Sequence, residues 1–114
     1  MSIMNRRKAP LPYEAEKVLV AIGSNLRTAR LRRNLTLDEV AKRIGVHRTT
    51  LALAEKGDPT VMVGTYVTAL WVYGLATQGL ELGAPDRDME GRALEAAGRR
   101  ERARPSTGGM SNDF

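Results

Sequence analysis

The sequence contains no cysteine and only one histidine, His47. Without cysteine the chain has no disulfide framework, no thiol nucleophile and no thiolate metal site. One imidazole also leaves too few ligands for a histidine-rich site, so we expect no metal and no other cofactor. No motif joins a nucleophile, a base and an orienting residue, and we do not expect an enzyme.

Aromatic residues and long apolar runs are scarce. Only 4% of the residues are aromatic, and no segment approaches the roughly 18 consecutive apolar residues of a membrane-spanning helix. Residues 1–17 lack the hydrophobic run of a signal peptide. These absences indicate a cytoplasmic protein that does not bind a membrane.

Acidic residues are outnumbered by basic ones, 13 against 18, and the formal net charge is +5. This excess points to an acidic partner such as nucleic acid, although a solvated basic surface without a partner would give the same balance. With 114 residues, the chain is long enough for one modest helical core and too short for two.

Residues 35–57, LTLDEVAKRIGVHRTTLALAEKG, are the most informative part of the chain. Apolar residues at the spacing of one helix face come first: Leu37, Val40, Ala41 and Ile44. Thr36 and Glu39 have the spacing of a capping box at the start of this helix. Gly45 supplies the left-handed residue that ends it.

A second short helix is expected to begin at His47 and to end at Gly57, with Leu51 and Ala54 facing inward. Two short helices joined by a glycine turn form the arrangement that places the second helix, the recognition helix, in the major groove of DNA.

Longer helices are expected on both sides of this motif. The first begins near Tyr13 and stops at a left-handed Asn34, and its inward residues are Leu19, Ile22, Leu26 and Ala29. The later helix ends at Gly74, and its expected inward stripe is Val63, Tyr66, Val67, Leu70 and Tyr73. A short fifth helix is expected over residues 76–82.

The sequence predicts one folded domain, residues 13–83, between two tails. Residues 1–12 read as a flexible basic arm. Residues 84–114 contain few large apolar side chains and predict a polar tail with an exposed helix over 86–103 and a disordered end. Its basic cluster at 99–104 could wrap DNA or dock on an acidic protein surface.

Residues 26–75 resemble the Cro/repressor (XRE-like) type of helix-turn-helix domain. The resemblance runs through NLRTARLRRNLTLDEVAKRIGVHRTTLALAEKGDPT and VGTYVTALWVYGL. Within that family, AEKGDPTV, GTYVTALWVYGL and PDRDMEGRALE are similar to HipB-like antitoxins, the DNA-binding partners of HipA-type kinase toxins. The resemblance implies an all-α, lambda-repressor-like domain of four to five helices with flexible tails.

The resemblance also implies contacts with DNA. Arg48 and Thr49 match positions that approach base edges, where arginine donates to guanine O6/N7 and threonine hydrogen-bonds a base or touches a thymine methyl. Thr50 would contact phosphate or belong to the helix cap. Leu53 faces outward, toward either a thymine methyl or another protein. Phosphate contacts would come from neighbouring basic residues, namely Lys42, Arg43, Arg48 and Lys56.

Three residues depart from the family pattern. His47 stands where serine or threonine normally caps the recognition helix, so it would be a poorer cap and either a phosphate contact or an ordinary surface histidine. Leu37 replaces a frequent glutamine that anchors the helix to phosphate. Ala54 is smaller than the usual inward residue, and we expect a neighbouring side chain to fill the space.

Arg30 and Glu55 match an arginine and a glutamate that commonly pair between the first and third helices of such domains. The resemblance implies a structural ion pair. The alternative is two ordinary solvated charges.

One recognition helix reads one half-site, and useful specificity normally needs two helices related by a two-fold axis. We therefore expect a homodimer. The candidate interface residues are Met62, Trp71, Val72 and Leu80. Tryptophan is favoured at interface centres, but Trp71 could instead close the edge of the core.

The residues and the resemblance together predict a dimeric repressor that binds a palindromic operator in double-stranded DNA. The narrower resemblance implies an antitoxin that also neutralises a HipA-like kinase toxin. A free-standing phage-type repressor, and a toxin-binding interaction protein with weak DNA binding, are the alternatives.

Overall fold

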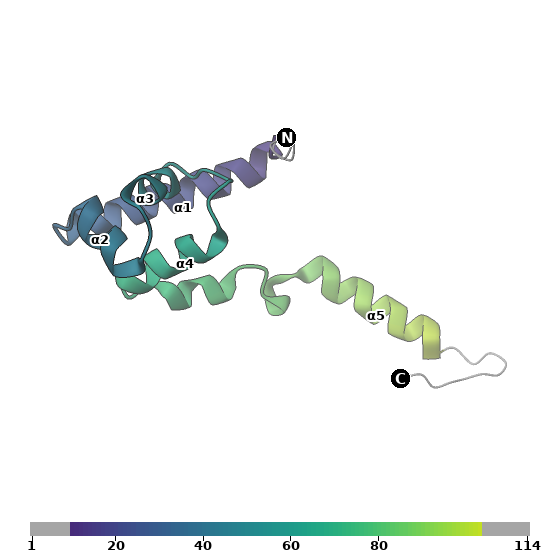
Figure 1. The fold of residues 1–114 in the computed structure, drawn as a ribbon. Coiled ribbons are helices and arrows are strands. Elements are labelled where there is room, and N and C mark those ends of the chain that lie inside the picture. The colour runs from purple at the N-terminus through teal and green to yellow at the C-terminus, as the bar shows by residue number, and fades with distance from the viewer. Residues whose placement is uncertain (1–9, 104–114) are drawn as a thin grey trace. The chain divides into compact units, whose positions relative to one another are not determined.

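The computed structural model describes residues 10–103, and every regular element among them is a helix (Figure 1). The all-α prediction is therefore confirmed. The chain divides into two units between Gly79 and Leu80, whereas the sequence placed the change at Gly83. Most of the predicted basic arm and the disordered end lie outside the described residues.

The first unit contains four α-helices, α1 Tyr13–Arg32, α2 Leu37–Ile44, α3 Arg48–Glu55 and α4 Val63–Val72. Helix α1 has acidic residues in its first turn and basic residues in its last turn, which suits the helix dipole. Asn34 follows α1 with φ 54°, the left-handed stop that the sequence predicted.

Local sequence signals define α2 as predicted. The Glu39 N–H donates to Thr36 Oγ1 (3.1 Å), and the Thr36 N–H donates to Glu39 Oε1 (2.8 Å), so both halves of the capping box form. Glu39 Oε1 accepts from the Thr36 N–H and also from the Thr36 hydroxyl (3.2 Å), and these two hydrogen bonds lower the pKa of Glu39. Gly45 ends the helix with φ 75°, and the chain turns directly into α3.

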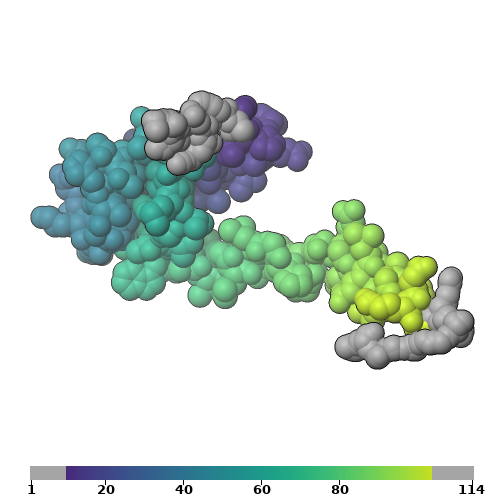
Figure 2. Space-filling view, turned by 45° about the vertical axis from the view of Figure 1, so that its right-hand side comes forward, coloured from purple at the N-terminus to yellow at the C-terminus, as the bar shows by residue number. Residues whose placement is uncertain are grey.

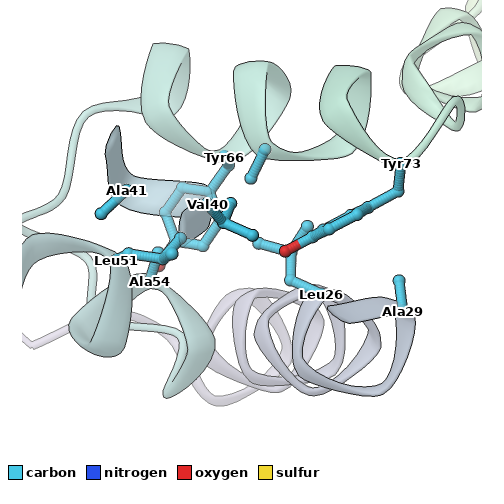
Figure 3. Close-up of a cluster of buried hydrophobic side chains, with 9 residues drawn as sticks. Leu26, Ala29, Val40, Ala41, Leu51, Ala54, Tyr66 and Tyr73 are labelled. Atoms are coloured by element: carbon cyan, nitrogen blue, oxygen red, sulfur yellow. The ribbon is translucent and has the colours of Figure 1, made fainter. Parts of the chain in front are cut away.

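The four helices enclose one small core. Its buried apolar residues are Leu26, Ala29, Val40, Ala41, Leu51, Ala54, Tyr66, Ala69 and Tyr73. Figure 3 shows the side chain of Tyr66, in α4, and that of Tyr73, directly after α4, projecting into the space between the helices. The Tyr66 hydroxyl donates to the backbone oxygen of Asp58 (2.8 Å) and so ties α4 to the loop that follows α3.

The predicted inward stripe of α4 was partly wrong. Val63 and Val67 are 75% and 47% exposed, whereas Tyr66, Ala69 and Tyr73 are buried. Successive residues of an α-helix are rotated by roughly 100°, and the two tyrosines fix which side of α4 faces the core. The two valines then lie at the edge of that side and reach solvent.

Helix α1 and the end of α3 approach each other backbone to backbone. A Cβ atom placed on Gly23 would lie 2.5 Å from the Ala54 oxygen and 2.7 Å from the Gly57 nitrogen. Ala54 itself is completely buried within the core.

The Tyr73 hydroxyl is buried and has no hydrogen-bond partner among the described residues. Burial raises the pKa of Tyr73. The guanidinium of Arg33 lies over the ring, 5.5 Å from its centroid, and donates to the Tyr73 backbone oxygen (3.1 Å). Neither contact uses the hydroxyl.

Tyr73→Phe should therefore raise the free energy of unfolding by about 1 kcal/mol, because it removes a desolvated hydroxyl and keeps the ring. Urea denaturation followed by circular dichroism measures the change. Tyr66→Phe is the matched control and should lose about 1 kcal/mol with its hydrogen bond. Equal destabilisation by both substitutions would show that the Tyr73 hydroxyl has a stabilising partner.

The expected fifth helix over 76–82 is a 3₁₀ segment, η2 Ala76–Glu81, and none of its residues is buried. The segment follows the left-handed Gly74 and contains Gly79. Without packing, so short a stretch containing a glycine does not support an α-helix. The boundary between the two units falls within it.

The second unit contains η3 Pro85–Arg87 and α5 Met89–Ala103, the helix expected within 86–103. Glu95 pairs with Arg99 (3.2 Å), one turn apart on this helix. Asp88 Oδ1 accepts from the Gly91 N–H (2.8 Å) and caps α5. No helix in residues 10–103 is long and apolar enough to cross a membrane.

Candidate nucleic-acid interface

Helix α3 has one buried face and one exposed face. Leu51, Ala54 and Glu55 are buried. Arg48 and Thr49 at its start are exposed, and Leu53 is 40% exposed. The residues predicted to read DNA thus lie outward on a helix that the core holds in place. Thr50, which is half-buried, belongs to the edge between the two faces.

Arg48 does not stand alone on this surface. Its Nε lies 3.4 Å from Asp38 Oδ1, and both side chains are more than half exposed. Such surface pairs are worth about 0–1 kcal/mol, so Asp38 orients Arg48 without fixing it. The closest contact is made by Nε, and the guanidinium stays accessible for contacts with a partner. Sequence reasoning missed this pair, since it depends on how α2 and α3 are placed.

His47 is the N-cap of α3, and its imidazole performs the capping that serine or threonine provides elsewhere. The Thr49 N–H donates to His47 Nδ1 (3.2 Å), and the Thr49 hydroxyl oxygen lies 2.7 Å from the same nitrogen. The sequence predicted a poorer cap than serine or threonine, and in the structure His47 Nδ1 reaches the first turn of α3.

The basic residues predicted to contact phosphate are exposed on the same two helices. Lys42 and Arg43 lie in the last turn of α2, and Lys56 follows the last residue of α3. In Figure 2 the side chains of α2 and α3 form a continuous surface of the first unit. Leu37 packs partly buried against the core and offers no polar atom to a phosphate.

Arg30 and Glu55 form a buried ion pair that stabilises the position of α3. The Arg30 Nε donates to Glu55 Oε2 (2.7 Å) and Nη2 donates to Oε1 (3.0 Å), with both residues buried. Arg30 Nη1 also donates to the Leu35 oxygen (3.0 Å). The hydrogen bonds to Glu55 raise the pKa of Arg30. One guanidinium therefore joins α1, the segment before α2, and the recognition helix.

The residues proposed for a dimer interface have different surroundings. Trp71 is 65% exposed and does not close the core edge. Met62 is also exposed, while Val72 packs partly buried against the core. Leu80 is exposed but belongs to the second unit. The exposed apolar residues of α4 and its N-cap, here called the α4 face, are Met62, Val63, Val67 and Trp71.

A compact helical unit that exposes the polar start of its third helix, close behind a glycine turn, has the architecture of a helix-turn-helix DNA-binding domain. The chain belongs to this class: a family model described as a helix-turn-helix domain matches residues 21–82, more than half of its length. The search of curated proteins and the search of solved structures gave no match. The family supports a protein that binds DNA.

Proposed function

We propose that the protein is a transcriptional repressor that binds a palindromic operator in double-stranded DNA as a homodimer. The observation that carries the proposal is the exposed start of α3, where Arg48 and Thr49 project from a helix whose opposite face is buried. Exposed cations also lie in the last turn of α2 and directly after α3, and such cations suit the phosphates on either side of a groove.

In the proposed complex the start of α3 enters the major groove. The Arg48 side chain is more than half exposed beside Asp38, and its terminal nitrogens match the O6/N7 pair of guanine. Lys42, Arg43 and Lys56 contact phosphates and hold the register without reading sequence. Leu53 lies farther along the same face and meets a thymine methyl.

Selection from random-sequence duplexes tests DNA recognition and supplies the probe. The wild-type chain should enrich a palindromic sequence, and Arg48→Ala should bind that sequence at least about 30-fold more weakly, because each subunit of the dimer loses one bidentate base contact of roughly 1–3 kcal/mol. Lys17→Ala, which removes an exposed charge near the start of α1, is the matched control and should change binding little. Failure of the wild-type chain to enrich any sequence would refute the repressor.

The α4 face suits the dimer because the segment Met62–Tyr73, MVGTYVTALWVY, carries no charged residue. In a two-fold dimer a surface meets its own copy, so a like charge would oppose itself and an uncharged apolar face would not. Tryptophan is also common at interface centres.

Trp71→Glu should convert the dimer to a monomer in sedimentation equilibrium and weaken operator binding, because it places two carboxylates at the contact. Leu94→Glu, at an equally exposed leucine of α5, is the control and should leave the dimer intact. A wild-type chain that sediments as a monomer would contradict the dimer.

A second candidate role is the antitoxin of a toxin–antitoxin module, which the resemblance to HipB-like sequences suggests. The second unit favours it, because α5 has no buried residue and its Met89 and Leu94 are exposed. Co-purification with a kinase encoded by an adjacent gene tests this role. An Arg48→Ala variant should bind the operator more weakly and still bind the kinase, whereas a free-standing repressor would bind no kinase.

A further inference from the structure

We infer that His47 sets the base preference of Thr49, by holding its hydroxyl so that Thr49 selects adenine or cytosine over guanine or thymine on the strand it contacts. The inference rests on the proposed function and specifies what one position of the recognition helix reads. It makes His47 a positioning residue for recognition as well as a helix cap.

We assign the imidazole tautomer of His47 from its backbone contact. The Thr49 N–H lies 3.2 Å from Nδ1 and can only donate, which assigns Nδ1 as the acceptor and places the ring proton on Nε2. The Thr49 hydroxyl is 2.7 Å from the same nitrogen. Because Nδ1 has no hydrogen to give, the hydroxyl must donate its own.

The hydroxyl of Thr49 is thereby committed as a donor within the protein. Only its oxygen lone pairs remain for DNA, and Thr49 is exposed at the start of α3. In the major groove, adenine N6 and cytosine N4 are donors, whereas thymine O4 and guanine O6 and N7 are acceptors. An oxygen that can only accept is satisfied by the first pair and repelled by the second.

A serine or threonine cap would not have this effect. A hydroxyl both donates and accepts, so it would let the Thr49 hydroxyl turn its hydrogen toward either the cap or the base. An imidazole nitrogen that accepts from the backbone has no such freedom. The departure from the family pattern at position 47 is therefore the source of the selectivity.

Selection from random-sequence duplexes with four chains tests the inference. Thr49→Val identifies the base pair that Thr49 reads, because preference there disappears. At that position the wild-type chain should prefer adenine or cytosine by about fivefold, the ratio that one hydrogen bond of ordinary strength gives. His47→Gly should lose this preference and keep the rest of the selected sequence. His47→Asn should restore it, since its amide oxygen accepts in place of Nδ1.

Glycine and asparagine are both tolerated at helix N-caps, and thermal unfolding of each variant verifies the fold. If His47→Gly keeps the preference that Thr49→Val abolishes, His47 is a cap only and the inference is wrong. The inference is also wrong if Thr49→Val changes the base preference at no position of the sequence that the wild-type chain enriches. If the wild-type chain enriches no sequence at all, the proposed repressor function itself is refuted.

Discussion

Replacing Glu55 with glutamine should lower the free energy of unfolding by about 3–5 kcal/mol. The carboxylate accepts two hydrogen bonds from Arg30, and both residues are buried. Glutamine would turn an amide N–H₂ toward one guanidinium nitrogen and leave a buried positive charge without its counter-charge. Leaving a buried charge without a partner costs far more free energy than removing the partner of a charge that is exposed to water. Urea denaturation followed by circular dichroism measures the loss.

Glu95→Gln is the matched control, because Glu95 also pairs with an arginine but is about two-thirds exposed. It should change stability by less than about 0.5 kcal/mol. Replacing both buried partners, Arg30→Met with Glu55→Leu, should recover much of the loss, since apolar pairs often substitute for buried ion pairs. Full stability of Glu55→Gln would mean that water, and not Arg30, solvates the carboxylate.

Gly23→Ala should destabilise the first unit by about 3 kcal/mol or more. The added methyl would lie 2.5–2.8 Å from the Ala54 oxygen, the Gly57 nitrogen and the Glu55 oxygen. These are backbone atoms of the end of α3, so no side-chain rotation relieves the overlap. The two helices must separate, and the Arg30–Glu55 pair that also joins them lengthens.

Gly64→Ala is the control for Gly23→Ala, because Gly64 lies inside α4 and its Cβ position is open. There the same substitution should stabilise by up to about 1 kcal/mol, the usual helix-propensity gain of alanine over glycine. Thermal unfolding compares the two variants. Similar stability of Gly23→Ala and the wild-type chain would mean that α1 shifts freely on α3.

Structural features that depend only on a few neighbouring residues could be predicted from the sequence. The capping box of α2, the left-handed Gly45 and the stop at Asn34 each depend on a few adjacent positions, and each forms in the structure. The outward placement of Arg48 and Thr49 follows from the same local pattern, because Leu51 and Ala54 fix the inward side of α3.

Features that depend on how helices meet could not be predicted. The apolar pattern of α4 includes Val63 and Val67 but does not show whether they are buried. The packing of Tyr66 and Tyr73 decides which side of the helix faces the core. The contact of Gly23 with α3 requires the distance between two helices far apart in sequence. The Asp38–Arg48 pair likewise needs the angle between α2 and α3.

The division of α3 into a buried and an exposed face has an evolutionary consequence. Residues that hold the helix, such as Leu51 and Glu55, are distinct from those that we propose read DNA, Arg48 and Thr49. Substitutions at these two exposed positions would leave the core intact, so the DNA preference that we propose could change without loss of folding. His47 is the exception, because it caps the helix and contacts a reading residue. The fold should therefore tolerate substitutions at positions 48 and 49, whereas a substitution at position 47 would also remove the helix cap.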